Sequence, residues 1–269
     1  MNRSAAYALA PLPAVAVGLV VMRTHGVPSS RLLIQVVACI LGLGLFALVR
    51  RVRINEKWNT WFTLLTIAFL ATSFLGHGEQ GVYRWVSLGG VQLHAAAIAC
   101  PILLVAFVRS SFVAGFEAPA RLGALALLAA QPDAGQTTAL GLTLLVLCWQ
   151  RSTGMTALLH TISYLLMITI AWSLPDGLKP IIEVEGIVDL AFAQGTWLGG
   201  LALTTLALPI ATLFAAPTRP LGPCLATYLL VSFIVTRIAH FPVPLLGYGA
   251  APILGTLIAF GAIAHQEAS

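Results

Sequence analysis

GVYRWVSLGGVQ, residues 81–92, is a polar, glycine-rich stretch with one arginine that lies between two long apolar runs. Three other polar segments interrupt apolar sequence in the same way. They are residues 131–137 (QPDAGQT), residues 183–189 with the acids Glu183, Glu185 and Asp189, and residues 241–249 (FPVPLLGYG). What the chain does depends on whether these four segments are loops that open on one side of a membrane.

The composition predicts a membrane protein. Apolar residues make up 59% of the chain, charged residues only 9%, and the mean hydropathy is +0.94. A soluble domain carries roughly a quarter of charged residues. Most of the chain falls into apolar runs of about 17–23 residues, the length of a membrane-crossing helix, and the alternation of barrel strands is absent. The expected fold class is all-α: a polytopic integral membrane helix bundle.

Ten membrane spans are predicted. They lie at residues 5–22, 32–49, 59–76, 94–109, 119–131, 137–150, 153–173, 193–215, 221–239 and 246–265. The two spans beside residues 131–137 are short, which indicates that this segment dips into the bundle. No connection is long enough for a further domain, so residues 1–269 are predicted to form a single transmembrane domain.

The distribution of Lys and Arg predicts that both termini are cytoplasmic, because nine of these residues then lie inside and five outside. The inner residues are Arg3, Arg50, Arg51, Arg53, Lys57, Arg109, Arg121, Arg151 and Arg219. The outer acids are Glu79, Asp133, Asp176, Glu183, Glu185 and Asp189. All four polar segments then share the outer face. Acids, arginine and glycine gathered at one face of a bundle suggest a site.

Three of the polar segments resemble motifs of the SEDS family (shape, elongation, division and sporulation), the FtsW- and RodA-like peptidoglycan glycosyltransferases. The family pattern G-A-R-R-W-I-x-L-G-x-x-x-Q-P-S-E resembles residues 81–92. Its Q-P-D-L-G-T resembles residues 131–136, and its G-x-P-L-P-F-x-S-Y-G-G resembles residues 241–250. The motifs occur in the same order among ten spans, so the chain is identified as a short, divergent member.

The chain departs from the family pattern at two places. After Gln92 the family continues P-S-E and then a lysine, and both charges are missing here. The residues at those positions are Leu93, His94, Ala95 and Ile98. The loop that carries the family's catalytic aspartate is also shorter. That aspartate aligns near Val188, with Asp189 one residue later and Glu185 four residues before Asp189.

The resemblance implies polymerisation of lipid II, a disaccharide linked to undecaprenyl diphosphate, at the outer face of the bacterial cytoplasmic membrane. Such a reaction needs a carboxylate to take a proton from the attacking 4-hydroxyl. It also needs positive charge, or a divalent cation, to stabilise the leaving diphosphate. The candidate catalytic residues are Asp189 and Glu185. The candidate substrate-binding residues are Arg84, Trp85, Gln92, Gln131, Asp133 and Tyr248. The family further implies a class B penicillin-binding protein as partner, in cell shape or cell division.

Each candidate also has a structural interpretation. Arg84 beside Trp85 is typical of an interfacial anchor, and Asp133 before a new span is typical of a helix N-cap. Asp176 and Glu183 are expected to be solvated loop charges. Glu185 and Asp189 would share a face if both lay on one helix. His77, Glu79 and His94 lack the defined spacing of a metal site.

Two other functions stay open at this stage. The missing charges after Gln92 and the shortened loop would suit a catalytically impaired scaffold that binds a cell-wall synthase. A transporter of a lipid-linked precursor would instead be expected to hold a polar site at the membrane midplane, whereas the charges here gather at the outer face.

Overall fold

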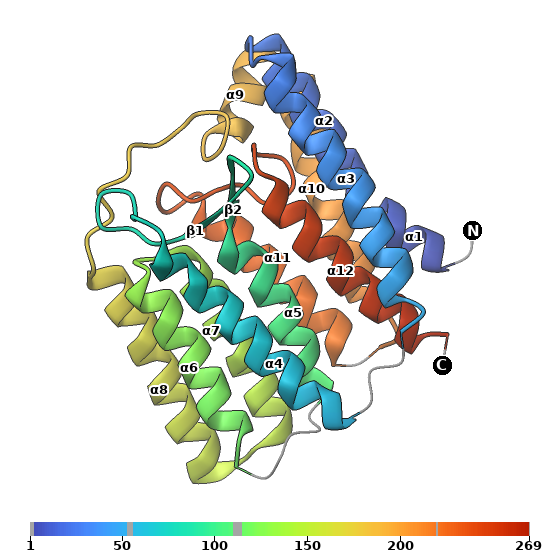
Figure 1. Ribbon diagram of the computed structural model, residues 1–269. Helices are drawn as coiled ribbons and strands as arrows, with labels where there is room; N and C mark the ends of the chain where they lie inside the picture. Colours follow the sequence, from blue (N-terminus) through green and yellow to red (C-terminus); the bar gives the residue numbers. More distant parts are fainter. Residues whose placement is uncertain (1–2, 53–55, 110–114, 219, 269) are drawn as a thin grey trace. The chain divides into compact units, whose positions relative to one another are not determined.

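The computed structural model describes residues 3–52, 56–109, 115–218 and 220–268 (Figure 1), with only the backbone at residues 56 and 57. Three basic positions used for the orientation, namely Arg53, Arg219 and the side chain of Lys57, lie outside what is described. The helices are α1 Arg3–Leu9, α2 Leu12–Thr24, α3 Ser29–Val49, α4 Glu56–Ala71, α5 Ala95–Arg109, α6 Glu117–Ala130, α7 Ala134–Arg151, α8 Gly154–Ser173, α9 Ile187–Gln194, α10 Thr196–Phe214, α11 Leu221–Val235 and α12 Ala250–Gln266. A short 3-10 helix, η1 Thr72–Leu75, continues α4.

Every predicted span contains helix, so the prediction of an all-α bundle is confirmed. The first span is divided into α1 and α2 at residues 10 and 11, where Pro11 removes a backbone donor. Stretches long and apolar enough to cross a membrane are Arg3–Thr24, Ser29–Val49, Trp58–Leu75, Gly154–Ser173 and Thr196–Phe214. The chain is a polytopic membrane protein.

The chain separates into two compact units. Unit 1 comprises Met1–Val52 and Lys179–Ser269, and unit 2 comprises Arg53–Leu178. Each unit has its own helices and its own polar loops. The single transmembrane domain with two cytoplasmic termini stays a prediction.

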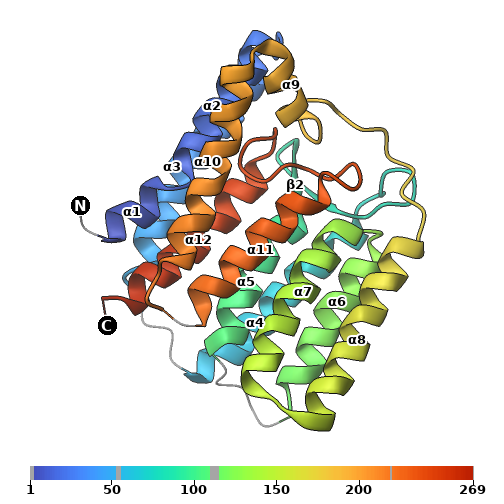
Figure 2. The same ribbon diagram turned by 180° about the vertical axis from the view of Figure 1, so that it is seen from behind.

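Unit 1 is built around the parallel pair of α3 and α12, which pack along their length (Figures 1 and 2). Glycines let the two backbones approach. A Cβ at Gly261 would lie 2.9 Å from the carbonyl oxygen of Phe46, and one at Gly42 would lie 2.6 Å from a methyl carbon of Leu257. Because apolar burial gives little net attraction between helices in lipid, close packing of small residues is what holds such a pair together.

Unit 2 packs α4 along α5, and α6 and α7 along α8. The lipid side of α8 is apolar and exposed, as shown by Leu159 at 57% and Ile162 at 55%. Such exposed apolar side chains suit a helix that faces hydrocarbon rather than water. The polar loops of unit 2 therefore have to be fixed by specific contacts at the helix ends.

Residues 81–92 are not an irregular loop, as the sequence led us to expect, but largely an antiparallel hairpin. Strand β1 spans Trp85–Leu88 and pairs with β2, Val91–His94, so that Ser87 faces Gln92. The turn residues Gly89 and Gly90 have φ angles of +57° and +82°. Two consecutive positive φ angles are what a tight two-residue hairpin turn requires, so glycine is needed at both positions.

Candidate functional site

Asp133 occupies the N-terminus of α7 in unit 2. Its carboxylate accepts a hydrogen bond from the Gln136 amide at 3.1 Å, which confirms the predicted N-cap role. The residue is only 1% exposed, so the segment at 131–137 dips into the protein as expected. A buried carboxylate requires partners that offset the loss of water.

Arg84 supplies one of these partners from the residue before β1. Its Nη2 donates to Asp176 at 2.6 Å and also to the carbonyl oxygen of Pro132, while its Nε lies 3.9 Å from Asp133. The Arg84 side chain is 3% exposed. An interfacial anchor would keep its charged head in water, so that interpretation of Arg84 is wrong. Asp176, expected to be solvated, is instead bound to a buried guanidinium.

His94 supplies the second partner from the end of β2. Its Nδ1 accepts from the Ala97 amide at 3.2 Å, at the start of α5. Nδ1 therefore carries no proton, and the proton of the neutral ring is on Nε2. Nε2 lies 3.1 Å from Oδ2 of Asp133. The side chains that cap α5 and α7 thus contact each other and join the two helix starts.

The surroundings of Asp133 keep it ionised. Burial acts to raise the pKa of this carboxyl group, but the Arg84 guanidinium, His94 and the Gln136 amide more than offset it and hold the pKa below its ordinary value. The charged form is the one that accepts hydrogen bonds from its neighbours. The cluster of Arg84, His94, Asp133 and Asp176 is called the buried ion cluster below.

Three further predicted residues belong to the same region of unit 2. Gln131 is fully buried and its amide donates to the Leu70 carbonyl oxygen at 2.9 Å and to Ser73 at 2.8 Å. The Trp85 ring meets the His94 ring edge to face at 6.3 Å. Gln92 is exposed on the hairpin and accepts from Ser87. Gln131 and Trp85 therefore adjoin the buried ion cluster, and Gln92 faces solvent.

In unit 1 the two candidate catalytic acids do not share a helix face. Helix α9 begins at Ile187, so Asp189 lies in its first turn and Glu185 lies before it. The Glu185 carboxylate accepts from the Ile181 amide at 2.6 Å and closes a turn. The alternative in which both acids lay on one helix is therefore wrong, because the glycine at 186 separates the turn from α9.

Asp189 forms an exposed ion pair with Arg237. The two Asp189 oxygens lie 3.0 and 3.2 Å from the same Arg237 nitrogen, with the side chains 64% and 50% exposed. Arg237 is one of the five Lys and Arg residues predicted on the outer side, and it was not among the predicted site residues. The available signal was its position four residues before the 241–249 segment.

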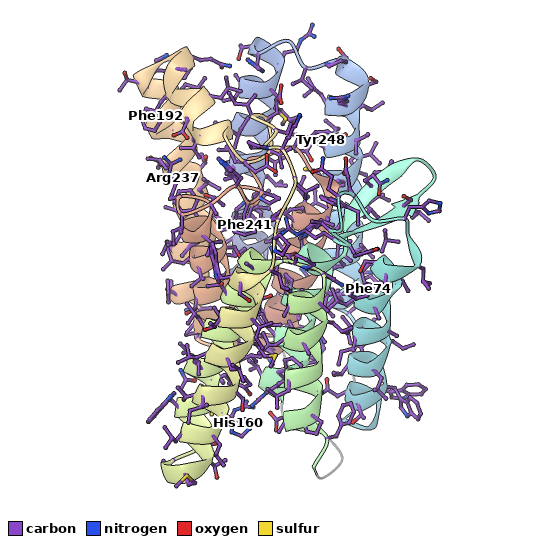
Figure 3. All side chains as sticks on the ribbon, turned by 90° about the vertical axis from the view of Figure 1, so that its left-hand side faces the viewer. Phe74, His160, Phe192, Arg237, Phe241 and Tyr248 are labelled. Atoms are coloured by element: carbon purple, nitrogen blue, oxygen red, sulfur yellow. The ribbon has the colours of Figure 1, made fainter. Side chains whose placement is uncertain are left out.

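The segments at 183–189 and 241–249 meet within unit 1. Val243 donates to the Val184 carbonyl oxygen at 3.1 Å, and Tyr248 donates to that of Glu183 at 2.8 Å. Figure 3 shows Tyr248 and Arg237 toward the same end of this unit. The hairpin and the 131–137 segment meet in unit 2. That all four segments form one site stays a prediction.

The described residues do not fit a divalent cation. No group of three or more His, Cys, Asp and Glu side chains suited to a metal ion occurs among them. Of the acids in unit 1, Glu183 lies 3.1 Å from Nδ1 of His25 and Asp189 is engaged with Arg237. We therefore assign no step to a metal ion, and a divalent cation stays a prediction.

Comparisons with known proteins show which solved structures share this fold. No protein-family model and no curated protein matches the chain. The crystal structure of Thermus thermophilus rod shape determining protein RodA superposes with a TM-score of 0.69 at 17% identity, over 97% of this chain and 96% of that one. A mutant of the same RodA gives 0.69 at 18% identity. A structure described as the structural coordination of polymerization and crosslinking by a peptidoglycan synthase complex gives 0.66 at 18%, over 96% of both chains. The chain has a SEDS-like fold.

We expect the buried ion cluster to contribute far more stability than the exposed ion pair. Arg84→Met leaves Asp133 and Asp176 without their guanidinium and should lower the free energy of unfolding by about 3–5 kcal/mol. The matched variant Arg237→Met removes an exposed pair and should cost at most about 1 kcal/mol. Denaturant unfolding of the purified proteins in detergent measures both. Equal losses would contradict the structural role of the cluster.

A second expectation concerns how the stability of the fold changes at low pH. The folded-state pKa of Asp133 is below its ordinary value, so its charge stabilises the fold above about pH 4, and this contribution is lost as the pH falls through the folded pKa. Asp133→Asn should therefore unfold at a lower temperature than the wild type at pH 7, and the gap should shrink towards pH 3. A gap that widens on acidification would disprove the assignment.

Proposed function

We propose that this chain is a divergent SEDS-type glycosyltransferase that polymerises lipid II, an undecaprenyl-diphosphate-linked disaccharide, at the outer face of the bacterial cytoplasmic membrane. The RodA-like fold over nearly the whole chain supports the family, and the three matched motifs support the location of the site. The observation that carries the chemistry is the exposed ion pair of Asp189 and Arg237 beside the 241–249 segment.

The two members of this pair meet the two requirements of the reaction. Asp189 is the base that takes the proton from the attacking 4-hydroxyl. Arg237 binds the diphosphate, which leaves with the electrons of the broken glycosidic bond, because a guanidinium forks onto phosphate oxygens. In the free protein the two groups neutralise each other. Once Arg237 binds a diphosphate, the Asp189 carboxylate is released from the pair and can accept the proton of the 4-hydroxyl.

Asp189 suits the role of base better than Glu185. The Glu185 carboxylate already accepts the Ile181 amide at 2.6 Å and so stabilises the turn before α9. The Asp189 side chain is 64% exposed and that of its partner Arg237 is 50% exposed. The residues of the buried ion cluster hold the unit 2 loops in place, and Tyr248 and Gln92 remain candidates for sugar contacts.

A second function has one observation in its favour. The positions of the family's glutamate and lysine after Gln92 are Ala95 and Ile98, and the buried ion cluster is closed by His94 instead. A scaffold that binds a cell-wall synthase without catalysis would tolerate this replacement. Under either function the expected partner is a class B penicillin-binding protein, which one structural relative supports because it belongs to a peptidoglycan synthase complex.

Polymerisation of purified lipid II tests the proposal. We expect the full chain in detergent or vesicles to produce glycan polymers, alone or with a class B penicillin-binding protein, under conditions in which an authentic SEDS polymerase does so. A monodisperse, folded protein that binds the partner but makes no polymer in either case would replace the enzyme by the scaffold.

A further inference from the structure

Gln35 is a buried amide on an apolar membrane helix. It lies on α3 and is fully buried. A side-chain amide removed from water costs free energy unless its donor and acceptor are both used. Polar residues inside membrane spans are therefore functional candidates, and Gln35 is one that lies outside all four polar segments.

The Gln35 amide binds the backbone on both sides of Tyr248. Its Nε2 donates to the Gly247 carbonyl oxygen at 3.1 Å, and its Oε1 accepts from the Gly249 amide at 3.2 Å. One side chain thus satisfies a carbonyl and an amide that flank the same residue. Only a group that donates and accepts at this length fits both.

The same three residues are also held from the other side. The Tyr248 amide donates to the Glu183 carbonyl oxygen at 2.8 Å. A Cβ at Gly247 would lie 2.5 Å from the Val184 carbonyl oxygen, so glycine is needed for this approach. The backbone of the Tyr248 turn is therefore fixed between α3 and the segment that carries the acids.

We propose that Gln35 is a positioning residue that holds the Tyr248 turn against residues 183–185, and so sets the position of Tyr248 relative to Asp189 and Arg237. The catalytic consequence rests on the proposed function, whereas the fixation of the turn does not. Gln35 touches no reacting group. It acts through the backbone of the turn.

Hydrogen–deuterium exchange of the full chain tests the fixation. Gln35→Leu removes both bonds and should speed exchange in the 241–249 segment about tenfold or more, since each lost bond weakens the turn. The matched control is Asn59→Leu, because Asn59 is also a buried amide on a membrane helix and donates to the Ala106 carbonyl oxygen at 3.1 Å. Asn59→Leu should leave exchange in this segment unchanged. Unchanged exchange in Gln35→Leu, or an equal rise in the control, would overturn the inference.

Gln35→Glu separates positioning from a general loss of stability and serves if Gln35→Leu does not fold. An ionised glutamate accepts but cannot donate, and a protonated one does both. Because a fully buried carboxyl group keeps its proton to a higher pH than an exposed one, exchange relative to the wild type at the same pH should be fast at pH 8 and return towards the wild-type rate at pH 5. If the ratio of the exchange rate of Gln35→Glu to that of the wild type does not change with pH, this would count against a positioning role for Gln35. If the wild type makes glycan, Gln35→Leu should slow polymerisation and Asn59→Leu should not, and a wild type that makes none leaves the exchange test intact.

Discussion

A single buried carboxylate fixes the loop geometry of unit 2. Asp133 is 1% exposed, yet it stays ionised because it caps α7 and contacts Arg84 and His94. Each contact comes from a different part of the chain, so the hairpin, the start of α5 and the turn before α7 are held at one place. A group of this kind cannot be removed alone without leaving an uncompensated charge in the protein interior.

In unit 1 the 241–249 segment is held by hydrogen bonds to its backbone, whereas in unit 2 the polar loops are held by charged side chains. The 241–249 segment is fixed by Gln35 and by the carbonyl oxygens of Glu183 and Val184. The charged side chains of the same region are left at the surface, where Asp189 and Arg237 pair with each other. Exposed ion pairs are weak and exchange partners readily. Buried groups thus hold the frame in place, and the proposed function assigns the reactive chemistry to exposed ones.

The sequence predicts the features that follow from local patterns. The length of the apolar runs is sufficient to predict the spans, and a proline followed by Asp133 is sufficient to predict the N-cap of α7. The pair Gly89 and Gly90 between two short alternating stretches was a usable signal for the hairpin that we read as a loop. The links from Arg84 to Asp176 and from Asp189 to Arg237 join residues distant in sequence, so no local pattern reports them. The turn before α9 is closed by the Glu185 side chain on the Ile181 amide, and the hydrophobic pattern does not report this bond.

Catalysis by Asp189 is the central claim, and the polymerisation rate per folded molecule tests it most directly. Asp189→Asn keeps the size of the side chain but cannot take a proton, and Glu185→Gln is the matched change at the neighbouring acid. We expect Asp189→Asn to lower the rate of lipid II polymerisation at least about a hundredfold, and Glu185→Gln to keep most of the wild-type rate. Glycan synthesis that survives Asp189→Asn and disappears with Glu185→Gln would contradict the assignment.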